Sequence, residues 1–131
     1  MTRKERNRYG VPRFLSGNLW LFGGWGFAAS GSGRLNDLWK FDGTNWTWVS
    51  GSNVTNQAGV YGTKGVAASG NVPGTRYVSV SWTDSSGNLW LFGGLGLAAS
   101  DSGSLKDLWK FDLLEKAADI NGDGIVDFED L

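Results

Sequence analysis

Short apolar runs alternate with stretches of glycine and small polar residues along this chain. Residues 19–22 are four bulky apolar residues followed by a glycine pair. An uninterrupted apolar run of this length predicts a strand covered on both faces, and the glycines predict its end. A polar, glycine-rich loop is expected over residues 28–36. Residues 38–41 then predict a second strand, with Trp39 and Phe41 on one face.

Two further strands are predicted downstream, at residues 46–49 and 77–82. The segments 42–45 and 84–87 each begin with Asp and contain glycine with Asn or Ser, which predicts tight turns. Short strands joined by such turns indicate antiparallel hairpins and an all-β fold. The residues expected to share a face are Trp46 with Trp48 in the earlier strand, and Val78 with Val80 and Trp82 in the later one.

The chain repeats itself with a period of 70 residues. Residues 17–42 read GNLWLFGGWGFAASGSGRLNDLWKFD, and residues 87–112 read GNLWLFGGLGLAASDSGSLKDLWKFD. Of 26 aligned positions 21 are identical, which marks a repeat architecture. A single unit forms a sheet too small to bury both faces, so the units are expected to stack. The differing positions are Trp25/Leu95, Phe27/Leu97, Gly31/Asp101, Arg34/Ser104 and Asn36/Lys106.

The two copies have different neighbours in the sequence. A full strand, 77–82, precedes the second copy, whereas only residues 11–16 separate Gly10 from the first. Conversely, the strand at 46–49 follows the first copy and has no counterpart after the second. About six strands in two incomplete sheets are therefore expected.

The order GNLWLFGG, NDLWKFD, NWTWV, followed by an Arg-Tyr pair at residues 76–77, resembles the kelch repeats of bacterial galactose-oxidase-like β-propellers. The resemblance covers roughly residues 10–112 and implies two incomplete blades of antiparallel strands. Family units run nearer to about 50 residues, and the excess here is the loop at 50–75, a length typical of functional or disordered loops. Because a closed propeller needs about 4–8 blades, the resemblance implies a fragment of a larger protein or several copies that assemble.

Composition excludes several kinds of chemistry. The 131 residues contain no cysteine and no histidine, which excludes disulfides, thiol catalysis and the usual transition-metal ligands. A net charge of −1 gives no electrostatic basis for binding nucleic acid, and no apolar run is long enough to span a membrane. Residues 1–9 are basic and expected to be disordered, and they lack the apolar segment of a signal peptide.

Residues 119–130, DINGDGIVDFED, fit a calcium-binding loop. Such a loop needs oxygen ligands at positions 1, 3, 5, 9 and 12, a backbone carbonyl at position 7 and glycine at position 6, which here is Gly124. An acidic tail without structure is the alternative interpretation. The candidate Ca²⁺ ligands are Asp119, Asn121, Asp123, Asp127 and Asp130, with the carbonyl of Ile125.

This loop resembles the first half of a dockerin module, and residues 113–118 favour a short helix before it. The segment 113–131 is therefore expected to form a helix and a single calcium site. The site is expected to be weak, because position 12 is Asp130 where the usual loop has glutamate. The sequence carries no second loop and no exit helix, which argues against binding of a cohesin partner.

The sequence offers little to a catalytic interpretation. In the kelch family, copper-oxidase chemistry uses histidine and a cross-linked cysteine, and the chain has neither. Asp37 with Asp107, and Asp42 with Asp112, occupy equivalent repeat positions, which favours turn and strand-end roles over catalysis. Trp25 and Trp46 are expected to pack between units, with stacking on sugar rings as the alternative.

The expected function is a non-catalytic binding or interaction module with a protein or carbohydrate ligand, from a secreted or cell-surface parent protein. Two alternatives remain open. The chain could be a piece of a galactose-oxidase-like or glycan-degrading enzyme whose active site lies in other blades, or a structural homo-oligomer that completes a propeller in trans.

Overall fold

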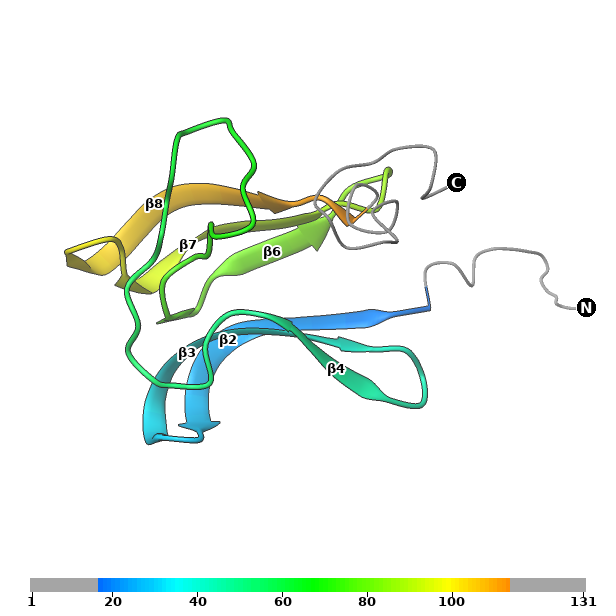
Figure 1. Ribbon diagram of the computed structural model, residues 1–131, viewed down its shortest axis with the longest axis horizontal. Coiled ribbons are helices and arrows are strands. Elements are labelled where there is room, and N and C mark those ends of the chain that lie inside the picture. Colours follow the sequence, from blue (N-terminus) through cyan, green and yellow to red (C-terminus); the bar gives the residue numbers. More distant parts are fainter. Residues whose placement is uncertain (1–16, 114–131) are drawn as a thin grey trace, which may run out of the picture.

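A computed structural model describes residues 17–113, which form two antiparallel β-sheets lying one above the other (Figure 1). The predicted all-β class is confirmed for these residues. Sheet one contains β2 (Leu19–Ala28), β3 (Gly31–Phe41) and β4 (Trp46–Ser50) in that order. Sheet two contains β5 (Arg76–Tyr77), β6 (Val80–Thr83), β7 (Leu89–Leu97) and β8 (Ser102–Phe111).

The strand β7 is the centre of sheet two. It pairs with β8 along nearly its whole length, and on its other edge it pairs with β6 and then with β5. The repeat-equivalent strand β2 pairs with β3 alone and is an edge strand among the described residues. The two sheets therefore share a hairpin and differ in the strand added to it: β4 in sheet one, β5 with β6 in sheet two.

The prediction that the glycine pair ends the strand is wrong. The strand β2 continues through Gly23 and Gly24 to Ala28, and the expected loop at 28–36 is mostly β3. The register shifts between Phe22 and Gly24, which marks a β-bulge. Both glycines have positive φ, +60° and +102°, so they accommodate the bulge where another residue would be strained.

The expected strand at 77–82 is also divided. It forms β5 and β6, separated at Val78, whose φ of 54° lies in the left-handed region and is incompatible with a strand. Val80 and Trp82 still share a face, because they pair with Phe92 and Trp90 of β7. Val78 does not join them.

Both predicted turns are confirmed, and each is organised by its aspartate. Asp42 Oδ1 accepts hydrogen bonds from the backbone N–H groups of Thr44 and Asn45 at 2.9 and 2.8 Å. Asp84 Oδ1 accepts from Ser86 and Asn88 in the same way, at 2.9 and 3.0 Å. These bonds replace the hydrogen bonds to water that the turn amides would otherwise need.

The two sheets stack through one face of each. Strand register puts Trp20, Phe22 and Leu38 on one face of sheet one, here named its inner face. The inner face of sheet two carries Leu89, Leu91, Trp109 and Phe111. Leu38 and Leu91 are the buried apolar residues of the described chain, and the rings of Trp20 and Phe111 meet across the interface with centroids 6.3 Å apart.

Sheet one is not covered on its other face by any described residue, contrary to the expectation for an apolar run. Leu19 and Leu21 are more than half exposed, and with them lie Trp39, Phe41, Trp46 and Trp48, which strand register places on the same side. The ring of Phe41 stacks on that of Trp46 at 5.0 Å. These six residues form the outer face of sheet one.

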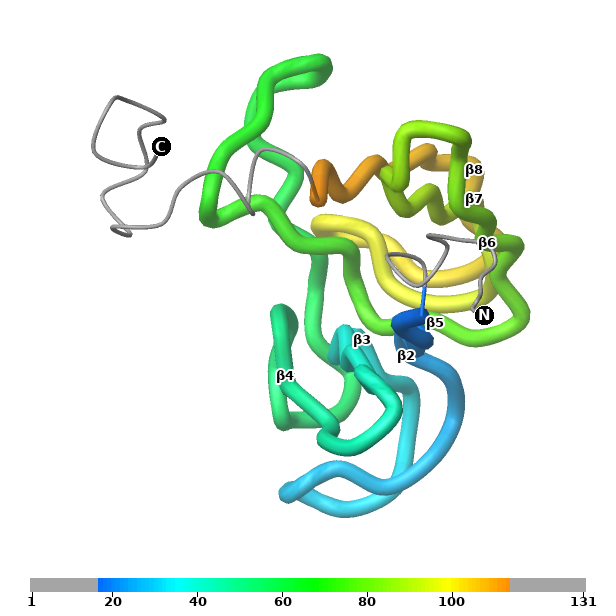
Figure 2. The backbone as a smooth tube through the Cα atoms, turned by 90° about the vertical axis from the view of Figure 1, so that its right-hand side faces the viewer, coloured from blue at the N-terminus to red at the C-terminus, as the bar shows by residue number. Residues whose placement is uncertain are grey.

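The linker at 51–75 is ordered and connects the two sheets on one side of the stack (Figure 2). Its backbone bonds both sheets: the N–H of Asn56 donates to the carbonyl of Arg34, and that of Gly59 donates to the carbonyl of Ala98. A bridge between Val60 and Val72 closes the part between them into a loop. The long loop predicted here therefore holds the two repeats together.

Three predicted segments lie outside the described residues. These are the basic start at 1–9, the helix at 113–118 apart from Leu113, and the calcium loop at 119–130.

Candidate functional site

Arg76 and Asp107 form an ion pair with two hydrogen bonds. The guanidinium of Arg76 is fully buried, and its two terminal nitrogens donate to Oδ1 and Oδ2 of Asp107 at 2.7 and 2.9 Å. Arg76 Nε also donates to the carbonyl of Gly74, and Nη1 to that of Gly93. The position of a charge this deeply buried depends on these bonds, because an unpaired buried charge is strongly unfavourable.

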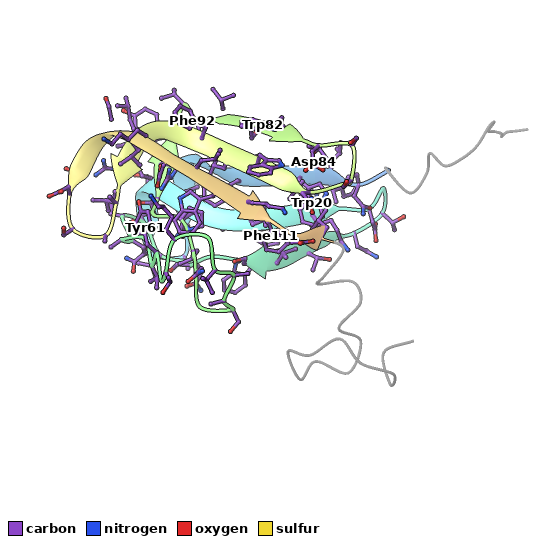
Figure 3. All side chains as sticks on the ribbon, turned by 90° about the horizontal axis from the view of Figure 1, so that it is seen from above. Trp20, Tyr61, Trp82, Asp84, Phe92 and Phe111 are labelled. Atoms are coloured by element: carbon purple, nitrogen blue, oxygen red, sulfur yellow. The ribbon has the colours of Figure 1, made fainter. Side chains whose placement is uncertain are left out.

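Asp107 is also bound by two aromatic residues. Tyr61, from the linker, donates its hydroxyl hydrogen to Oδ2 at 2.7 Å, and Trp109 donates from Nε1 to the same oxygen at 2.8 Å. The rings of Tyr61 and Trp109 pack together with centroids 5.0 Å apart. Figure 3 shows Tyr61 and its loop beside β8. One carboxylate thus connects β5, β8 and the linker.

The same bonds determine the ionisation of the cluster. Burial alone would raise the pKa of Asp107, but hydrogen bonds from Arg76, Trp109 and Tyr61 outweigh it and lower the pKa from 3.8 to about 2. Burial raises the pKa of Tyr61 above 10, and its hydrogen bond to Asp107 acts in the same direction. At neutral pH the carboxylate is charged and the phenol is neutral, which is the pair of states that the hydrogen bond requires.

Sequence reasoning missed this role of Asp107, since it assigned the repeated aspartates to turns and strand ends. That interpretation is confirmed for Asp42 at its turn. Two sequence features contain Arg76 and Asp107: the Arg-Tyr pair at 76–77, and an Asp-Leu-Trp triplet in both repeats. The pairing of the two features could not be read from their separation of 31 residues.

The repeat-equivalent Asp37 has a simpler environment. It accepts a hydrogen bond from Trp39 Nε1 at 2.7 Å, which matches the bond from Trp109 to Asp107. No arginine and no tyrosine bind it among residues 17–113, because the strand and linker equivalent to β5 and 51–75 are not among them. The Asp-x-Trp bond is therefore common to both repeats, and the arginine bond depends on β5, which belongs to sheet two.

Asn36, one of the five positions that differ between the repeats, fixes the linker. It is buried, its Nδ2 donates to the carbonyl of Pro73 at 3.0 Å, and its Oδ1 accepts from the N–H of Ser52 at 3.0 Å. The second repeat has Lys106 at this position, and its side chain is exposed. The two equivalent positions thus differ in burial as well as in residue type: Asn36 is buried and bonded to the linker, and Lys106 is exposed.

A cleft of about 2000 Å³ runs between the sheets and along the linker. Aromatic and basic side chains contribute much of its wall, and its polar groups include those of Tyr61 and Asp107. On the side of sheet two that faces away from sheet one, Trp82 and Trp90 stack with their rings nearly parallel, 6.0 Å apart, and the ammonium of Lys110 lies 5.8 Å from the Trp90 ring. Flat aromatic surfaces beside donors suit an extended ligand with both apolar and hydroxyl or amide groups.

The predicted metal ligands, Asp119 to Asp130, lie outside the described residues. Between residues 17 and 113 no three Asp or Glu side chains are grouped closely enough to hold a metal ion. The same part of the chain contains no helix long and apolar enough to cross a membrane.

No protein-family model, no curated protein and no solved structure matches this chain.

Proposed function

We propose that the protein is a non-catalytic binding module built from kelch-type repeats, with the cleft between its sheets as the ligand site. The observation that carries this proposal is the state of the Asp107 cluster. Its carboxylate is held ionised, and its two oxygens are occupied by Arg76, Tyr61 and Trp109. Such a carboxylate stabilises the fold and lines the cleft. It is poorly suited to transfer a proton, because its pKa of about 2 is far from neutral pH.

The kelch assignment is part of the proposal. It is supported by two sheets that contain the same hairpin, each with the glycine pair in a bulge and each with an Asp-x-Trp bond. On this proposal, sheet one with its following strand β4 is one incomplete blade, and sheet two with its preceding strands β5 and β6 is another. In a secreted or surface protein, such blades would present a protein or carbohydrate site.

The calcium loop at 119–130 is the second part of the proposal. Its support is the sequence: five side-chain oxygen ligands and a glycine at the one position where the loop turns sharply. A single loop without a partner is proposed to bind one Ca²⁺ weakly.

The binding function is tested by titrating the whole chain with soluble probes and following tryptophan fluorescence. The probes are cellohexaose, chitohexaose and a pool of random peptides. Saturable binding to one class is expected, with the probe recovered unchanged by mass spectrometry. Trp20→Leu, in the cleft wall between the sheets, should weaken binding at least about tenfold, whereas Trp25→Leu, outside it, should not.

Chemical conversion of a probe would favour the rival interpretation, a glycan-degrading enzyme. Binding that is unaffected by Trp20→Leu would show that the cleft is not the site.

A further inference from the structure

The two leucines buried between the sheets each have an exposed twin in the other repeat. Leu38, on the inner face of sheet one, is 7% exposed, and its equivalent Leu108 is 56% exposed. Leu91, on the inner face of sheet two, is 8% exposed, and its equivalent Leu21 is 55% exposed. The same side chain is thus buried where two repeats meet and exposed where they do not.

This relation extends to the whole outer face of sheet two. Strand register places Val80, Trp82, Trp90, Phe92, Leu108 and Lys110 on it. Its positions Trp90, Phe92 and Leu108 are the repeat equivalents of Trp20, Phe22 and Leu38, which form the inner face of sheet one. Figure 3 views sheet two from this side and labels Trp82 and Phe92.

The outer face of sheet one is the counterpart. Its Leu19, Leu21, Trp39 and Phe41 are the repeat equivalents of Leu89, Leu91, Trp109 and Phe111, which form the inner face of sheet two. The described chain therefore contains one formed interface between repeats, made by the two inner faces. Its two outer faces carry the same residue types as the two sides of that interface, but they are not joined to each other. Soluble proteins rarely leave apolar faces of this kind uncovered on two opposite sides.

We propose that a second copy of this chain docks head to tail, with the outer face of its sheet one on the outer face of sheet two of the first copy. The occupant is identified by the interface already present: the chain uses these residue types, in this register, to hold its own two sheets together. In the docked pair Leu108 takes the position of Leu38, and Leu21 of the second copy takes that of Leu91. This proposal rests on the stacking of the sheets and not on a ligand in the cleft.

A head-to-tail contact has a distinct consequence. It uses two different surfaces, so every added copy leaves one surface of each kind free, and the chains form a ring if the rotation closes or a filament if it does not. An isologous contact between two identical faces would stop at a dimer. The stoichiometry of the assembly therefore reports the mode of docking.

The test is sedimentation velocity on the full chain over a range of concentrations without any probe. The mass of the wild type is expected to rise with concentration to at least twice the 14.1 kDa of the monomer. Leu21→Glu and Leu108→Glu should each reduce the assembly to monomer, because every head-to-tail contact needs both faces and each variant lacks one of them. Phe27→Glu, at the exposed tip of the hairpin between β2 and β3, is the matched control and should assemble as the wild type does.

Mixing the two variants separates head-to-tail docking from its rivals. Each variant alone should remain monomeric, because its intact face meets no intact partner. The mixture should form a one-to-one complex and nothing larger, since Leu21→Glu retains the outer face of sheet two and Leu108→Glu retains that of sheet one. All of these side chains are exposed, so unchanged thermal melting would show that the variants fold.

A wild type that stays monomeric while folded would overturn the proposal and assign the faces to another occupant, such as a carbohydrate or another part of the chain. Dimers formed by either variant alone would overturn it in favour of an isologous contact. Neither result bears on ligand binding in the cleft, which the fluorescence titration measures separately.

Discussion

Asp37 and Asp107 occupy the same position in two nearly identical repeats, yet only Asp107 is bound by an arginine among the described residues. Both carboxylates accept a hydrogen bond from the tryptophan two residues later. The difference between them is the buried guanidinium of Arg76 and the hydroxyl of Tyr61, so the two aspartates form a natural comparison of one side chain in two environments.

The first prediction uses this pair. Asp107→Ala leaves the Arg76 guanidinium buried without its counter-ion and should cost about 3–5 kcal/mol in the free energy of unfolding. Asp37→Ala removes one hydrogen bond and should cost about 1 kcal/mol. Urea unfolding followed by tryptophan fluorescence measures both. Equal losses would contradict the role assigned to Arg76.

The second prediction concerns acid. The pKa of Asp107 is about 2 in the folded chain and 3.8 ordinarily, so its ionised form stabilises the fold above about pH 4. That contribution is lost as the pH falls from about 4 toward about 2, where the folded carboxyl takes up its proton. The pKa of Asp84 is lowered to about 2 as well, chiefly by the hydrogen bond from Trp90, and acts in the same direction.

Unfolding by urea at a series of pH values tests this dependence. The free energy of unfolding of the wild type should decline as the pH falls from about 4 to about 2. It should decline less steeply in Asp107→Asn, whose side chain cannot ionise. A variant with the undiminished slope would show that other carboxyls dominate acid unfolding.

The third prediction exchanges a position that differs between the repeats. Asn36→Lys breaks the bonds to Pro73 and Ser52 and places a charge in a buried site, so we expect a loss of about 2–4 kcal/mol. The reverse exchange, Lys106→Asn, lies on an exposed site and should change stability by less than about 0.5 kcal/mol. Thermal unfolding of the two variants provides the comparison, and similar shifts would be evidence against anchoring of the linker by Asn36.

The fourth prediction compares Gly24 with Gly94. Their φ angles are +102° and +100°, so alanine strains the backbone equally at both. A Cβ at Gly94 would clash with Ser79 Oγ and lie 2.8 Å from the carbonyl of Tyr77, whereas a Cβ at Gly24 meets nothing within 4 Å. Gly94→Ala should therefore cost about 1–3 kcal/mol more than Gly24→Ala in urea unfolding. Equal costs would mean that the segment joining β5 and β6 does not pack on β7 in solution.

The fifth prediction concerns calcium. Isothermal calorimetry should detect one site, with a dissociation constant on the order of 10⁻⁴ M or weaker. Asp119→Ala and Asp123→Ala should abolish the heat, because each removes a charged ligand. No heat at millimolar calcium, or heat that persists in both variants, would reject the site.

Sequence patterns located the strands and both turns, because alternation and turn-forming residues are local properties, but they placed a loop at 28–36 where most residues belong to β3. The patterns failed at Gly23, where β2 continues through a bulge, and at Val78, whose positive φ divides the expected strand. Composition reveals neither of these backbone conformations. The patterns also failed for Asp107, because its partners Arg76 and Tyr61 come from segments 31 and 46 residues away. The exposure of Leu21 and Leu108 could not be predicted either, since their sequence surroundings match those of the buried Leu91 and Leu38.

The Asp84 turn has a consequence for how the chain finds its fold. The strands β2 and β7 both begin with Leu-Trp-Leu-Phe, so β6 has two nearly identical edges with which it could pair. Only one lies close in sequence: four residues at 84–87 with an adjoining Asn88 connect β6 to β7, whereas more than fifty residues separate β6 from β2. Closing the short loop loses far less entropy, and the Asp84 hydrogen bonds favour it further. Local loop closure therefore favours pairing of β6 with β7 over pairing with the nearly identical β2. A duplicated sequence can in this way fold without mispairing of strands between its two repeats.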